Sequence, residues 1–353
     1  MIGGPVIEGP VRFSVLDLSP IPSGSTAAQA LQNTLDLARH AENLGLHRYW
    51  LAEHHNAGSL ASSSPEILIG AVASATTRIR VGSGGVMLPN HSPLKVAETF
   101  RVLVALHGDR IDLGVGRAAG TDPKTALALR QSRELLGAER FPEQLDELMT
   151  FLTREPDPGA RFGPIKAVPI GITPPPIFLL GSGFEGARLA ARLGVGYAYA
   201  HHISPEDHVA AMQAYRSAFQ PSRWSSEPYA ILATSVLCAE TDEEAEALRR
   251  CVDLQFIRFG QGLRDLPMPS VEEARAYRFD PEEEAFRASS RERHVVGTPD
   301  TVAEVLSKMA AATGAAEVMA TSNIHDHEAR KRSYTLVARA LGISNAPASA
   351  GSV

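Results

Sequence analysis

The sequence has few cysteines, no long apolar run and no long run of charge of one sign. Its two cysteines, Cys238 and Cys251, are too few for a disulfide framework or a cysteine zinc site in a chain of 353 residues, and we expect both to be buried. No apolar stretch reaches the roughly eighteen residues that a membrane span needs, and the N-terminus lacks the pattern of a signal peptide. These features predict a cytoplasmic protein with no membrane partner.

The charge balance is mildly acidic and evenly spread. The chain has 34 basic and 40 acidic residues, which give a net charge of -6 at pH 7. Without a basic run or patch in the sequence, nothing favours binding to nucleic acid or to an anionic membrane surface. We therefore expect small molecules rather than polyanions as binding partners.

Short apolar runs of strand length recur along the chain, and most are separated by ten to twenty residues of helical character. A parallel sheet covered by helices has strands that are apolar on both faces, as these are. Eight such βα units predict an α/β fold of the TIM (β/α)8 barrel type, with an open doubly wound sheet as the alternative. The candidate strands span residues 11–18, 48–52, 79–88, 111–116, 177–180, 195–200, 229–237 and 315–320.

The first predicted helix shows how these units begin and end. Ser25 can cap it, and its apolar residues between Leu31 and Leu44 recur three or four positions apart. Gly45 then supplies a left-handed stop, and Gly194 and Gly314 stand in the same position ahead of later strands.

Two stretches interrupt the repeating pattern. Residues 154–176 are rich in Pro and Gly and predict an ordered excursion. Residues 260–297 mix charges, prolines and aromatics, which predicts a lid or insertion before the last βα unit. We expect a single domain over residues 1–343 and a disordered tail over residues 344–353.

A glycine turn follows the fifth predicted strand and spells G-x-G-x-x-G through Gly181, Gly183 and Gly186. A dinucleotide site would also need an acidic residue at the end of the next strand, where this chain has His201-His202. The turn could still hold one phosphate, through the Ser182 hydroxyl and the first amides of the helix that follows. The alternative is an ordinary βα turn.

Arg117 follows the fourth predicted strand, at the rim of the proposed barrel where active sites form. Its guanidinium can bind phosphate oxygens in pairs. Since Arg117 and Ser182 follow neighbouring strands, both could reach one phosphate. The alternative is a surface arginine paired with Asp122.

The segment Glu53-His54-His55 contains two neighbouring histidines. In an extended strand they point to opposite faces, so they are poorly placed to bind one metal ion, and we expect no metal site. His54 could move protons in catalysis, or it could be a hydrogen-bonded structural residue.

Four stretches together resemble the bacterial luciferase-like flavin monooxygenases, in particular the single-chain members of the alkanal monooxygenase type. They are LDLSPIPSGS (16–25), YWLAEHHN (49–56), VGSGGVMLPNHSPL (81–94) and IDLGVGRAAGTD (111–122). The resemblance extends over about residues 13–342, and it is densest over 13–122 and 176–202.

This resemblance implies a TIM barrel that binds FMN at its carboxyl-terminal rim. It implies that Arg117 and the turn Leu180-Gly181-Ser182-Gly183 hold the FMN phosphate. A non-prolyl cis peptide between Gly84 and Gly85 would lie under the isoalloxazine ring, with a β-bulge as the alternative. His54 would be the catalytic histidine.

The implied reaction joins reduced FMN and O2 in a flavin C4a-hydroperoxide, which oxidises a small organic substrate such as an aldehyde. A separate reductase would supply the flavin. The resemblance also implies a homodimer, for which the small residues at positions 70–75 would allow close helix packing. An F420-dependent oxidoreductase and a non-catalytic flavin-binding protein remain alternatives.

Two positions depart from the family pattern. Gly116 stands where luciferase has a reactive cysteine, so nothing favours light emission. Glu185 would repel a phosphate unless it points outward.

Overall fold

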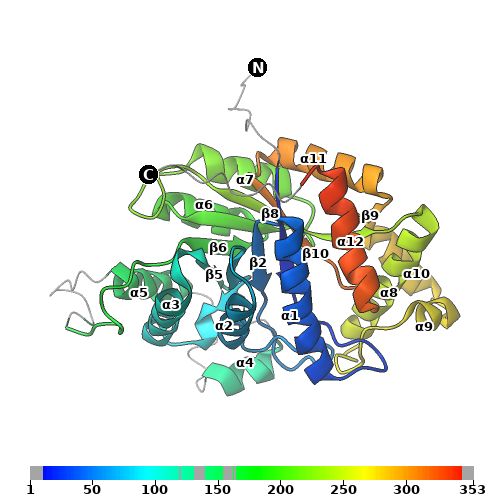
Figure 1. Cartoon of the computed structure of the whole chain (residues 1–353), viewed down its shortest axis with the longest axis horizontal. Coiled ribbons are helices and arrows are strands. Elements are labelled where there is room, and N and C mark those ends of the chain that lie inside the picture. The colour runs from blue at the N-terminus through cyan, green and yellow to red at the C-terminus, as the bar shows by residue number, and fades with distance from the viewer. Residues whose placement is uncertain (1–10, 119–120, 131–139, 154–161, 163, 344–353) are drawn as a thin grey trace.

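Eight parallel strands close into a barrel with helices around it (Figure 1). The computed structural model describes residues 11–118, 121–130, 140–153, 162 and 164–343. The strand order is β10-β1-β2-β3-β5-β6-β7-β8, and pairing of β8 with β10 closes the ring. The predicted TIM-barrel fold is confirmed. The strands are β1 (Arg12–Asp17), β2 (Arg48–Leu51), β3 (Arg80–Ser83), β5 (Ile111–Gly116), β6 (Ile177–Gly181), β7 (Gly196–Ala200), β8 (Ala230–Cys238) and β10 (Glu317–Thr321).

All eight predicted strands are present, but the third is not continuous. The predicted strand 79–88 is split into β3 and the short β4 (Val86–Met87), because the peptide bond between Gly84 and Gly85 is cis and turns the chain. β3 pairs with β2 and β5, whereas β4 pairs with β5 alone.

The outer helices follow the strands as the sequence pattern predicts. Gly45, Gly194 and Gly314 each end a helix with positive φ, at 82°, 62° and 64°. The cap of α1 is Thr26 rather than Ser25, because the Thr26 hydroxyl accepts the Gln29 N–H at 3.1 Å. The helices are α1 (Ala27–Leu44), α2 (Pro65–Ala75), α3 (Pro93–His107), α4 (Pro123–Arg130), α5 (Phe141–Thr153), α6 (Phe184–Leu193), α7 (His208–Ser217), α8 (Asp242–Gly260), α11 (Pro299–Thr313) and α12 (His327–Ala340).

The predicted insertion between β8 and the last unit has secondary structure of its own. It contains α9 (Val271–Ala276), α10 (Pro281–Ser289) and the strand β9 (His294–Gly297). β9 pairs with the end of β8, and the sequence analysis missed it because a four-residue strand carries little periodicity. The predicted tail and residues 154–161 and 163 of the Pro/Gly-rich stretch lie outside the described residues.

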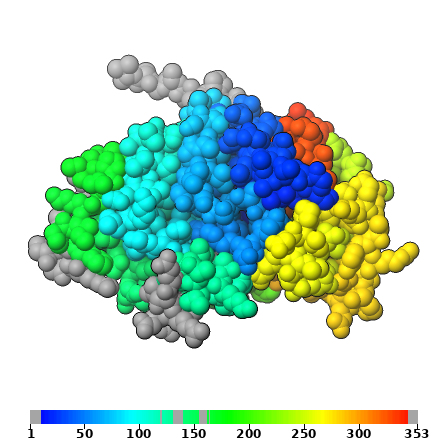
Figure 2. Space-filling model, turned by 90° about the horizontal axis from the view of Figure 1, so that it is seen from below, coloured from blue at the N-terminus to red at the C-terminus, as the bar shows by residue number. Residues whose placement is uncertain are grey.

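The start of the insertion lies at the carboxyl-terminal rim of the barrel, beside the loops that follow β1 and β2. The Ser23 N–H donates to the Met268 carbonyl at 2.9 Å, and the Gly58 N–H donates to the Asp265 carboxylate at 3.1 Å. Figure 2 shows this face, with the yellow insertion against the blue N-terminal segments.

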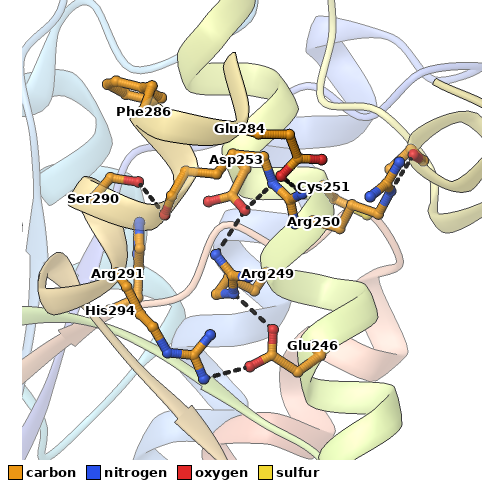
Figure 3. Close-up of polar contacts among 12 residues, drawn as sticks. Glu246, Arg249, Arg250, Cys251, Asp253, Glu284, Phe286, Ser290, Arg291 and His294 are labelled. Carbon is orange, nitrogen blue, oxygen red and sulfur yellow. Dashed lines mark hydrogen bonds and ion pairs between the residues drawn. The ribbon is translucent and has the colours of Figure 1, made fainter. Parts of the chain in front are cut away.

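One buried and one exposed ion pair hold the rest of the insertion against α8 (Figure 3). Asp253 on α8 is buried and accepts hydrogen bonds from Arg249 at 2.8 Å and from Arg287 of α10 at 3.0 Å. Glu246 of α8 accepts from Arg291 at 2.8 Å. These contacts fix α10 to the outer face of α8.

Inside the barrel, the side chains form layers below the carboxyl-terminal rim. The lowest layer is charged: the Arg48 guanidinium donates to Asp112 at 2.6 Å and to Glu317 at 2.8 Å. Above it, the rings of Trp50 and Phe178 meet edge to face, with centroids 5.0 Å apart. The barrel is therefore closed from below, and only its upper part is open.

Both cysteines are buried, as expected, and unpaired. Burial raises the pKa of Cys238 to about 12 and that of Cys251 to about 11, so neither is a ready thiolate. Among the residues that the structure describes, no helix has the length and apolar character needed to cross a bilayer.

We expect the charged layer to contribute to the stability of the fold. Arg48→Met should lower the free energy of unfolding by about 3 to 5 kcal/mol, because it leaves the buried carboxylates of Asp112 and Glu317 without their central cation. Urea unfolding measures this. Lys308→Met, which breaks an exposed pair with Glu304, is the matched control and should change nothing measurable. Equal stability of the two variants would contradict the assignment.

Candidate active site

A cavity of about 1100 Å³ opens at the carboxyl-terminal rim of the barrel. Its wall is formed by the ends of the barrel strands and by one face of α8. All the residues predicted for the site line it, and they come from four separate segments of the chain. They are His54, Gly84, Gly85, Arg117, Leu180, Gly181, Ser182 and Gly183.

The charged residues of the cavity wall are mostly basic. They comprise four arginines, at positions 117, 188, 192 and 293, and one carboxylate, Glu185. This local excess of positive charge contrasts with the net charge of -6 of the whole chain. Such a concentration of positive charge in a cavity favours an anionic ligand.

The glycine turn joins β6 to α6 at this wall. The Tyr199 hydroxyl donates to the Ser182 carbonyl at 3.2 Å, and the Tyr197 hydroxyl donates to the Gly183 carbonyl at 3.0 Å. Gly183 is the N-cap of α6 and offers no side-chain cap, and a Cβ added to it would meet nothing within 4 Å. The first amides of α6 are thus left for an anion, as expected for a phosphate turn.

Arg117 lies beside this turn, because Gly116 and Leu180 are register partners in β5 and β6. Its guanidinium forms an ion pair with Glu185, at 2.5 Å. The alternative pairing with Asp122 is wrong: Asp122 instead accepts hydrogen bonds from Asn56 at 3.0 Å and from the Thr125 hydroxyl at 2.7 Å. Glu185 therefore points toward the expected phosphate position rather than away from it.

Gly84 and Gly85 form a part of the cavity wall that has no side chains. The peptide bond between them is cis, as the resemblance implies, in place of the β-bulge considered as the alternative. A Cβ on Gly84 would lie 2.5 Å from a methyl carbon of Leu16, and one on Gly85 would lie 2.8 Å from the Gly114 carbonyl oxygen. Glycine is therefore required at Gly85, where the close atom is backbone, whereas a side chain at Gly84 would need the Leu16 side chain to shift. Both glycines place bare backbone in the cavity wall.

His54 lines the cavity together with Trp50 and Ala52, as strand alternation predicts. Its Nδ1 is buried and has no hydrogen-bond partner. Burial, and then the neighbouring His202, lower the pKa of His54 to about 4. The imidazole is therefore neutral near pH 7 and can accept a proton.

Glu53 and His55 point away from the cavity and fix the loop. The Glu53 carboxylate accepts hydrogen bonds from His55 and His91, each at 2.8 Å, and from the Met87 N–H at 2.8 Å. Although burial alone would raise it, these bonds lower the pKa of Glu53 to about 2. Because His54 and His55 face different sides, this segment cannot form a shared zinc site.

The described residues contain one other group of possible metal ligands, at Asp36, His327 and Glu328. Lys331 donates to Asp36 at 2.9 Å and to Glu328 at 2.7 Å. An ammonium group thus already balances these carboxylates, and none of them lines the cavity.

The sequence analysis missed several residues of the cavity wall. His202 is half-buried beside His54, and burial lowers its pKa. Arg293 follows α10 and is partly buried, with no ion pair to any described residue. On α8, the cavity-facing positions have the i, i+3, i+4, i+7 spacing that marks one helix face, which is the signal that could have found them. They are Val252, Gln255, Phe256 and Phe259.

Comparison with known proteins identifies the family. The family model for luciferase-like monooxygenases matches residues 11–317. A luciferase-like monooxygenase of Escherichia coli strain K12 is 40% identical over 328 residues, which cover 92% of this chain and 96% of the relative. This chain belongs to the luciferase-like monooxygenase family. It is accordingly an oxidoreductase.

Two further similar proteins are matched over almost the whole chain. The N-acetyl-S-alkylcysteine monooxygenase of Bacillus subtilis is 36% identical over 334 residues, covering 94% of this chain and 98% of that protein. The crystal structure of apo-MsnO8 has a TM-score of 0.88 and 42% identity, with coverage of 95% and 99%.

More distant structures share the fold alone. The oxygenating constituent of 3,6-diketocamphane monooxygenase from Pseudomonas putida, in complex with FMN, has a TM-score of 0.70 at 20% identity. An F420-dependent secondary alcohol dehydrogenase, in complex with an F420-acetone adduct, has a TM-score of 0.63 at 16% identity. Both kinds of flavin thus occur on this fold.

Proposed function

We propose that this luciferase-like monooxygenase uses reduced FMN and O2 to oxidise a small organic substrate. The observation that carries the proposal is that Arg117 and the Ser182 turn meet at one wall of a single cavity that Gly84, Gly85 and His54 also line. Bound reduced FMN would supply the electrons that activate oxygen.

The residues present suit FMN in both its parts. The Arg117 guanidinium, the Ser182 hydroxyl and the uncapped start of α6 would hold the phosphate. The backbone of Gly84 and Gly85, which have no side chains of their own, would lie against the flat ring. Leu180, which lies beside Gly85, would add an apolar contact to the ring.

His54 would serve as the group that takes up or returns a proton near the reacting atoms. It is neutral because of its burial, and its Nδ1 has no protein partner to hold its proton. The wall of the cavity is largely apolar, which would limit the access of water to the reacting atoms.

The substrate would occupy the part of the cavity bounded by α8. Phe256, Phe259 and Met268 offer an apolar surface there, which suits a small organic molecule such as an aldehyde. We propose that a separate reductase supplies the reduced flavin.

F420 in place of FMN, and flavin binding without turnover, remain the competing functions. Titration with each cofactor tests whether F420 takes the place of FMN. The fluorescence of FMN should be quenched as it binds, and F420 should bind more weakly. Formation of the carboxylic acid from an added aldehyde distinguishes the second, since a storage protein would bind FMN and convert no aldehyde.

Arg117→Ala should weaken FMN binding by about 1.5 to 3 kcal/mol, the range for a hydrogen bond to a charged group. Fluorescence quenching of FMN measures the affinity. Arg39→Ala on the exposed face of α1 is the control and should leave the affinity unchanged. An Arg117→Ala variant that binds FMN as well as the unmodified protein would contradict the phosphate assignment.

His54→Ala should leave FMN affinity within about twofold but slow turnover by about 10²-fold or more, the usual contribution of a positioned acid or base. Turnover is measured as the carboxylic acid formed from an aldehyde in the presence of a flavin reductase. His40→Gln is the control and should keep full turnover, because the His40 ring lies outside the cavity, where it is hydrogen-bonded to Thr335. Unchanged turnover of the His54 variant would remove its catalytic role.

We further propose a homodimer through α2 and α3. On α2, four residues spaced i, i+3, i+4 and i+7 form an exposed stripe, and most of them are small. α3 lies beside α2, and its Leu106 is 70% exposed. A large apolar side chain so exposed favours contact with another surface, and small neighbours allow close helix approach. Ala73 does not belong to this stripe, because it is buried against the barrel. The stripe is Ile67, Gly70, Ala71 and Ser74.

Sedimentation tests this dimer. The unmodified protein should sediment with twice the chain mass, and Ile67→Glu combined with Leu106→Glu should give monomers, because the charges could not be buried. Phe286→Glu on α10 places the same charge on an exposed apolar residue elsewhere and should leave the dimer intact. A monomeric unmodified protein would remove the proposal.

A further inference from the structure

Glu185 is the only carboxylate in the part of the cavity wall that the structure describes. It forms an ion pair with Arg117, the arginine that would bind the flavin phosphate. It lies in the first turn of α6, two residues after the N-cap Gly183. Its carboxylate pairs with the Arg117 guanidinium at 2.5 Å. The side chains are 81% and 54% exposed, respectively.

This ion pair contributes little to the stability of the fold. Exposed pairs gain modest Coulomb energy in water and lose side-chain entropy, so they stabilise proteins only slightly. An acidic residue in the first turn also interacts favourably with the helix dipole while no anion is bound. The dipole interaction therefore favours Glu185 at this position only while the site holds no flavin.

A phosphate at the turn would change this balance. The phosphate would use the same guanidinium and the same helix start, so it would compete with Glu185 for the Arg117 Nη1 group that now holds the carboxylate. The released carboxylate then stays within one turn of a dianion, and like charges at short range repel. Glu185 therefore opposes phosphate binding in two ways.

We propose that Glu185 is an internal competitor of the flavin phosphate, which keeps FMN binding weak enough for the flavin to exchange during turnover. This inference rests on the proposed function, in which reduced FMN arrives from a separate reductase and oxidised FMN must leave again. An exchanging flavin requires a fast dissociation rate. A phosphate site with an intact Arg117 and no competing carboxylate would slow dissociation.

The variant Glu185→Gln tests the inference, because it removes the charge and keeps the size of the side chain. FMN should bind three- to tenfold more tightly, with most of the change in the dissociation rate, measured by fluorescence quenching and stopped flow. Riboflavin lacks the phosphate and is the ligand control. Its affinity should be the same for the variant and the unmodified protein.

Glu304→Gln is the matched protein control. Glu304 lies in an exposed ion pair with Lys308 on α11, so the substitution breaks a similar pair away from the cavity. It should leave the affinity for both flavins unchanged. Equal thermal melting of all variants shows that each is folded.

A double-mutant cycle separates the two effects of Glu185. In an Arg117→Ala background, Glu185→Gln should tighten FMN binding by a smaller factor, because only the direct repulsion remains to be relieved. An equal gain in FMN affinity in both backgrounds would show that Glu185 does not compete with the phosphate for Arg117.

The outcomes distinguish this inference from the proposed function. An unmodified protein that binds neither FMN nor riboflavin refutes the proposed function itself. An unmodified protein that binds FMN, with a Glu185→Gln variant that binds it no more tightly, refutes only the competitor role. Tighter binding of riboflavin by the same factor also refutes it, since the effect would not involve the phosphate.

Discussion

The pairing of β8 with β10, which closes the parallel sheet, is the constraint on which the site depends. Because every barrel strand is parallel to its neighbours, all their carboxyl ends meet at one rim. Residues that are far apart in sequence, such as His54 after β2 and Ser182 after β6, are thereby brought to one cavity. An open sheet would leave its two edge strands apart and could not surround a ligand. Closure thus converts eight separate strand ends into one binding wall.

The interior below that wall determines how deep a ligand can lie. Carboxylates of Glu317 and Asp112 raise the pKa of Arg48 although burial opposes its charge, so the guanidinium remains charged. The ring of Trp50 lies above it, and its indole N–H donates to Asp112 at 3.1 Å. The charged layer therefore also orients the tryptophan that forms the base of the cavity. This one network of charged residues therefore contributes both to the stability of the fold and to the geometry of the cavity.

The sequence was informative wherever local chemistry decides the structure. Helix ends at Gly45 and the strand before Arg117 follow from φ requirements and apolar periodicity. Sequence patterns could not predict which partner Arg117 takes, because Glu185 and Asp122 are both acidic and only the register of β5 with β6 brings Glu185 close. His202 and the cavity face of α8 were missed for the same reason: their roles depend on how the barrel closes and on where the insertion lies.

Side chains line the cavity at both of its ends, and the two ends can vary independently. At the β6 end, the amides of the turn lie beside the side chains of Arg117 and Glu185. At the opposite end, α8 presents side chains such as Phe256 inward, while Asp253 on its other face is tied to Arg287 of α10. Because that anchor fixes the helix position, residues on the inner face of α8 can change without moving the barrel. A family built this way can keep one cofactor geometry while its substrates differ.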